Sequence, residues 1–146
     1  MRTALGVIVG YILMFVLQVA AFMTIYTVMG ANWSFKPASY QASTRWTVMQ
    51  FVVLFVTATI AGLVCALIAR GGKATLMLAA VVLVLGFALG AAATAMRPAD
   101  THEVRTGNVA NMDAMNKARH PMWVVFLGPV IAAVGVVAGG KLKRRT

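Results

Sequence analysis

The chain has 146 residues, of which 61% are apolar and 11% are charged, and its formal net charge is +10. A soluble domain has about half apolar and about a quarter charged residues, so this composition excludes an ordinary water-soluble enzyme. It also excludes disorder over most of the chain, because disordered segments are poor in apolar residues. The composition therefore predicts a small membrane protein.

Four stretches contain no Asp, Glu, Lys, Arg or His, and each is long enough to cross a bilayer as a helix, which takes about 20 apolar residues. These stretches are 4–29, 46–69, 74–96 and 121–140. They lack the alternation of barrel strands, and a backbone in lipid must satisfy its own hydrogen bonds, so we expect helices. The predicted fold class is all-α, an integral-membrane, left-handed antiparallel four-helix bundle that forms one domain over 1–146, with outer loops at 30–45 and 97–120.

The first stretch is longer than the roughly 7–15 apolar residues of a secretory signal, so we expect an uncleaved first helix. Gln18 lies near its middle. An unpaired amide in lipid is costly, so Gln18 is expected to bond to Thr57, Thr59 or a backbone carbonyl. A contact between Gln18 and a ligand is the alternative.

Small residues recur at helical spacing in all four stretches, as in Gly6 and Gly10 of the first. Membrane helices associate by close packing, which small residues permit, so these rows predict helix–helix contacts within one chain or between chains. The residues expected in such contacts are Gly6, Gly10, Gln18, Ala58, Gly62, Gly86, Gly90, Gly128, Gly135 and Gly139. Pro129 lies within the fourth stretch and is expected to kink it.

The basic residues are unevenly distributed between the two sides of the predicted bundle. The segments 1–3, 70–73 and 141–146 hold seven of the 13 basic residues and no acid. The positive-inside rule therefore places both termini in the cytoplasm. The basic residues are expected to set the topology and to contact anionic lipid headgroups. Nucleic acid is not expected as a partner.

Charged chemistry is confined to the loops, since none of the four stretches contains a charged residue or His. Proton and ion coupling use such residues within the membrane, so a coupled exporter is not expected. Cys65 is the only cysteine, which excludes an intrachain disulfide and makes it a packing residue.

The 97–120 loop holds both histidines and all three acids. His102, Glu103, Asp113 and His120 are weak candidates for a metal site, because their spacing matches no common ligand pattern. A solvated loop is the alternative. A short interfacial helix is expected between a cap at Thr106 or Asn108 and Pro121.

Aromatic residues cluster at the outer boundary, at Tyr26, Trp33, Tyr40, Trp46 and Trp123. The first loop, 30–40, carries two of these aromatic residues and precedes Trp46. The second span ends in the sequence Leu67-Ile68-Ala69-Arg70. With four spans in 146 residues, this layout resembles that of small four-span bacterial inner-membrane proteins without an assigned activity. The resemblance implies the fold and the location but transfers no functional residue.

The leading hypothesis is a non-enzymatic accessory or scaffold subunit that packs against a larger membrane complex or against itself. Its expected partners are the lipid bilayer and another membrane protein or a second copy, and no cofactor is expected. The first alternative is a passive channel or carrier for a small neutral or hydrophobic solute, lined by Gln18, Thr57 and Thr59. The second alternative is a metal-dependent enzyme at the outer face.

Overall fold

A computed structural model describes residues 1–70, 72–96, 110, 113 and 117–143 of the chain. Its helices are α1 (Arg2–Met29), α2 (Ala31–Ser34), α3 (Thr44–Ala69), α4 (Gly72–Ala95) and α6 (Met122–Lys143). Four of them are long and apolar enough to cross a membrane, which is the architecture of a multi-pass membrane protein. The predicted all-α four-helix bundle is confirmed.

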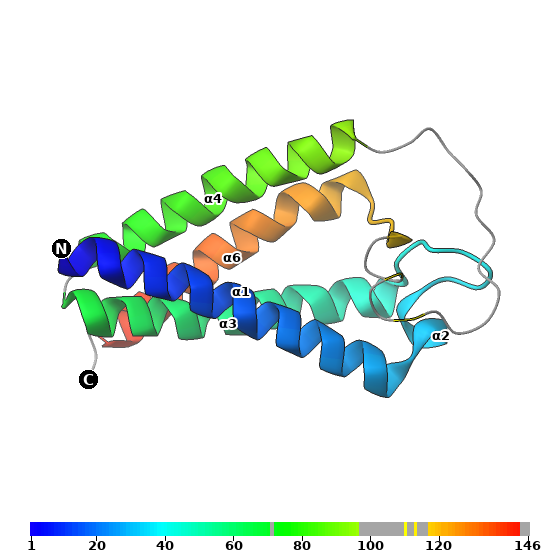
Figure 1. Cartoon of the computed structure of the whole chain (residues 1–146), viewed down its shortest axis with the longest axis horizontal. Coiled ribbons are helices and arrows are strands. Elements are labelled where there is room, and N and C mark those ends of the chain that lie inside the picture. The colour runs from blue at the N-terminus through cyan, green and yellow to red at the C-terminus, as the bar shows by residue number, and fades with distance from the viewer. Residues whose placement is uncertain (71, 97–109, 111–112, 114–116, 144–146) are drawn as a thin grey trace.

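The four long helices lie side by side and alternate in direction (Figure 1). Both chain termini and the turn between α3 and α4 lie at one end, which we call the terminal end. The opposite end carries α2, the connection from α1 to α3 and the start of α6, and we call it the loop end. Helices α3 and α6 make the most extensive contact, α1 packs against α3, and α4 packs against α6.

Each of the four long helices extends beyond its charge-free stretch at one end. Helix α3 starts two residues before Trp46, since the Ser43 hydroxyl accepts a hydrogen bond from the Trp46 amide at 3.1 Å and caps the helix. It ends at Ala69, and the next residue, Arg70, adopts a left-handed φ of 52° and donates its amide to the Ala66 carbonyl. Helix α6 continues through Lys141 and Lys143.

Helix α2 has no counterpart among the predicted elements. Gly30 ends α1 with a φ of 75°, a conformation that favours glycine, and the chain then forms one helical turn. The interfacial helix expected in the 97–120 loop lies mostly outside the described residues.

Candidate functional site

The seam between α3 and α6 is the closest contact in the bundle, and glycines from both helices form it. A methyl group on Gly62 would overlap the backbone of Val136, and one on Gly139 would overlap the backbone of Thr59. A methyl group on Gly135 would lie 2.8 Å from the Phe55 carbonyl oxygen. The two backbones therefore approach each other only because these positions carry no side chain.

Helix α1 uses its two glycines in the same way against α3 and α4. A methyl group on Gly6 would lie 3.0 Å from the Cys65 carbonyl oxygen. One on Gly10 would lie 3.2 Å from the Cys65 Cβ and 2.9 Å from Leu78 Cδ2. Cys65 has no exposed surface, which fits the packing role expected for it.

Helix α4 receives the ring of a proline from α6. A methyl group on Gly86 would lie 2.5 Å from Pro129 Cγ, and one on Gly90 would lie 2.9 Å from Val125 Cγ1. Helix α6 continues through Pro129.

The remaining residues of the expected contact set differ in how tightly they pack. Ala58 is fully buried, and its Cβ lies against Gly135. A methyl group on Gly128 would meet only Leu54 Cδ2, at the ordinary contact distance of 3.7 Å. Every glycine of the expected set therefore contacts a helix of its own chain, a choice that the sequence left open.

Two of the three residues expected to line a passage, Thr57 and Thr59, do not face it together, and Gln18 is half-buried. The Thr57 hydroxyl donates to the Val53 carbonyl at 2.8 Å, and the Thr59 hydroxyl donates to the Phe55 carbonyl at 2.7 Å. Both protons are thus used within α3 instead of reaching Gln18. Residues two apart lie about 200° around a helix axis, so Thr57 and Thr59 point to different sides of α3.

Gln50 is a half-buried polar residue that was not among the site residues expected from the sequence. The Gln50 amide oxygen is buried and has no hydrogen-bond partner among the described residues. A buried acceptor without a partner costs free energy, so Gln50 is a weak point of the bundle. Its position on one helical stripe with Thr57, Ala61 and Cys65 was the available signal.

The structure describes only two of the four weak candidates for a metal site. Asp113 is exposed and His120 is half-buried, whereas His102 and Glu103 lie outside the described residues. No group of three His, Cys, Asp or Glu side chains that could hold a metal occurs within the described part of the chain. The four-residue metal site remains a prediction.

The two connections at the loop end are joined to each other. The Arg119 amide donates to the Tyr40 carbonyl at 2.9 Å, and the Ala42 amide donates to the Arg119 carbonyl at 2.9 Å. The Lys117 ammonium lies 5.5 Å from the centre of the Tyr40 ring, within cation–π range. Segment 117–119 therefore fastens the α4–α6 connection to the α1–α3 connection.

Aromatic rings pack against one another at the loop end. The Trp46 ring lies edge-on to Tyr26 at 6.5 Å and to Trp33 at 6.2 Å, and Phe35 lies edge-on to Tyr26 at 6.2 Å. These are favourable aromatic geometries. The predicted boundary aromatics therefore also pack on one another and stabilise the loop end.

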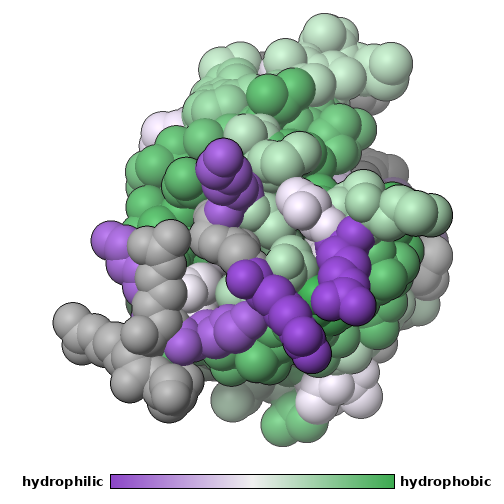
Figure 2. Space-filling view, turned by 90° about the vertical axis from the view of Figure 1, so that its left-hand side faces the viewer, coloured by the Kyte–Doolittle hydropathy of each residue, from purple (hydrophilic) through white to green (hydrophobic). Residues whose placement is uncertain are grey.

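The terminal end is basic. Figure 2 shows hydrophilic side chains gathered over this end, which contrast with the apolar surface around them. The described basic residues there are Arg2, Arg70, Lys73, Lys141 and Lys143, which come from the ends of all four long helices.

One row of three alanines and a valine is not used inside the bundle. Ala80, Val84, Ala88 and Ala92 recur every four residues on α4, and all four are exposed. Gly86, which packs against α6, lies two residues from Val84 and from Ala88 and so on the opposite side of the helix. We call the exposed row the α4 ridge.

A comparison with known proteins finds no family model, no curated protein and no solved structure that matches this chain.

Proposed function

We propose that the protein is a non-enzymatic multi-pass membrane subunit that packs through α4 against a larger membrane complex or against a second copy of itself. The observation that carries the proposal is the α4 ridge. Small side chains let another helix approach closely, and close packing is what drives association between helices in lipid. The glycine faces of α1, α3 and α6 have their partners within the chain, whereas the ridge has none among the described residues.

The close packing of the centre supports a subunit over the channel alternative. Ala58, Ala61, Cys65, Leu78 and Val136 have no exposed surface where the helices meet. Side chains thus fill the space between the helices at these positions. The separation of Thr57 from Thr59 around α3 argues in the same direction.

We further propose that the protein lies in the inner membrane of a bacterial cell with its terminal end in the cytoplasm. The described residues at the terminal end include five basic side chains and no acid. An excess of Lys and Arg in short loops is typical of the cytoplasmic side.

Cysteine cross-linking in native membranes tests the α4 contact. Ala88→Cys and Ala92→Cys place a thiol on the ridge, and Leu89→Cys is the matched control, since Leu89 is also exposed but lies about 100° from Ala88 and about 60° from Ala92 around the helix. Cys65 is fully buried, so the native thiol contributes little background. We expect a short bifunctional maleimide to join Ala88→Cys and Ala92→Cys to a second copy or to another protein, and to join Leu89→Cys much less. The absence of adducts at all three positions, together with a monomer in mild detergent, would contradict the proposal.

A further inference from the structure

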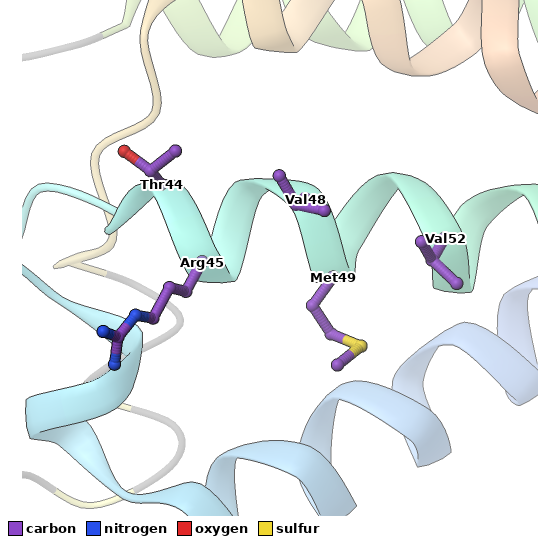
Figure 3. A pocket seen from close by; sticks show the side chains of 5 residues that line it. All are labelled: Thr44, Arg45, Val48, Met49 and Val52. Carbon is purple, nitrogen blue, oxygen red and sulfur yellow. The ribbon is translucent and has the colours of Figure 1, made fainter.

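Helix α3 carries a groove on its exposed face, next to the loop end. The groove has a volume of about 440 Å³ and is lined by Thr44, Arg45, Val48, Met49 and Val52. Figure 3 shows these side chains along α3, with Arg45 at the outer turn of the helix and Val52 deepest along it. Arg45, Val48 and Val52 are exposed, so the groove is open to the surroundings of the bundle.

The lining of this shallow, open groove is almost wholly apolar, and the Arg45 side chain leaves α3 at its outer end (Figure 3). The Arg45 guanidinium forms no ion pair with any described residue. Three apolar side chains continue the groove towards the middle of α3, and Val52 lies about 10 Å along the axis from Arg45, at 1.5 Å per residue. A ligand that fits this groove therefore carries a negative charge at one end and hydrocarbon at the other.

The position of Arg45 relative to the membrane–water boundary indicates which ligand this is. Arg45 is the second residue of α3 and precedes Trp46, one of the aromatic residues that occupy the membrane–water boundary in proteins of this class. The lipid phosphate lies at this boundary, and the acyl chains extend from it into the hydrocarbon core. Guanidinium is the side-chain group best suited to phosphate, because it donates several hydrogen bonds from one plane.

We propose that this groove is a binding site for a phospholipid of the leaflet at the loop end. Arg45 binds the phosphate, Thr44 lies beside the headgroup, and Val48, Met49 and Val52 contact one acyl chain. This site lies on α3, so it is independent of the α4 contact proposed above.

Photolabelling with a phospholipid tests the assignment. The intact protein is reconstituted into vesicles of phosphatidylglycerol and phosphatidylcholine that contain a phospholipid with a photoreactive diazirine on its acyl chain, and labelled peptides are identified by mass spectrometry. We expect labelling to concentrate on residues 44–52 in the wild type. Arg45→Gln is expected to weaken labelling there about tenfold, the effect of losing a charge-assisted hydrogen bond. Val48→Trp fills the groove and is expected to abolish the labelling while Arg45 stays in place.

Two matched variants serve as controls. Lys36→Gln removes another exposed cation from the loop end, and Val134→Trp adds the same bulk to an exposed position on α6. Both are expected to leave the labelling of 44–52 unchanged. Labelling spread evenly over α1, α3 and α4, or unchanged labelling in Arg45→Gln, would overturn the proposal. Cross-linking between two copies through Val48→Cys in place of lipid labelling would also overturn it, since a second chain would then cover the groove.

Discussion

The Lys143 ammonium donates a hydrogen bond to the Ala66 carbonyl oxygen at 2.6 Å, which joins the last turn of α6 to the last turn of α3. The same carbonyl accepts the Arg70 amide at 3.1 Å. A positive charge at a helix C-terminus also interacts favourably with the partial negative charge of the exposed carbonyls. The contact thus closes the terminal end of the α3–α6 pair.

Removal of this ammonium is expected to destabilise the bundle. Lys143→Met keeps most of the aliphatic chain and should lower the free energy of unfolding by about 1 kcal/mol, the usual size of such a hydrogen bond with its helix-end charge. Lys141→Met is the control, because Lys141 is exposed and lies on the same turn. Denaturant titration in detergent micelles measures the difference. Equal effects of the two variants would show that the Ala66 contact contributes nothing specific.

The α3–α6 seam is expected to tolerate no added methyl group at Gly62. Gly62→Ala would bring a Cβ onto the Val136 backbone, so the helices must separate, and we expect a loss of about 1–3 kcal/mol from overpacking. Gly128→Ala is the matched control, since its methyl group meets only Leu54 at 3.7 Å. Thermal unfolding in detergent separates the two outcomes. A Gly62→Ala variant as stable as Gly128→Ala would contradict the close approach of these helices.

A double-mutant cycle tests the fit of the Pro129 ring against Gly86. Gly86→Ala is expected to destabilise the protein by about 1–3 kcal/mol, because the new methyl group would lie 2.5 Å from Pro129 Cγ. In a Pro129→Gly background neither the Cβ nor the Cγ of residue 129 is present to meet the new methyl group, so the same substitution should cost much less. The coupling between the two positions is the measured quantity. Strictly additive effects would mean that the two side chains do not touch.

The buried oxygen of Gln50 predicts a substitution that does not destabilise the protein. Gln50→Met keeps the length of the side chain and removes the acceptor, and we expect stability to stay equal or to rise by about 1 kcal/mol. Chemical denaturation of the variant beside the wild type measures this. A loss of stability would show that the amide has a partner, such as a bound water molecule, that the contacts of the described residues do not include.

The bundle could be predicted from the sequence because lipid imposes a simple rule on a chain. Charged residues are costly in hydrocarbon, so the charge-free stretches coincide with the helices to within a turn. The ends differ because hydrogen bonds decide them, as the Ser43 hydroxyl does at the start of α3. Helix α2 escaped prediction because one turn after Gly30 leaves no periodic pattern.

The partners of the small residues could not be predicted in the same way. Gly86 and Ala88 look equivalent in the sequence, yet Gly86 packs on Pro129 whereas Ala88 is exposed on the other side of α4. Every surface in such a bundle is apolar, so hydropathy does not tell an inner face from a lipid-facing one. The groove beside Arg45 escaped prediction for a related reason, since its apolar residues read only as part of a span.

The arrangement of four membrane-spanning helices with both termini on one side is tested most directly by labelling single cysteines in sealed vesicles with a membrane-impermeant maleimide. Thr3→Cys, Arg70→Cys and Lys141→Cys report on the terminal end, Ser39→Cys reports on the loop end, and the wild type with its buried Cys65 supplies the background. We predict that the first three label from one side of the membrane, the cytoplasmic side in cells, and that Ser39→Cys labels only from the other. Labelling of Ser39→Cys and Arg70→Cys from the same side would contradict the four-span bundle.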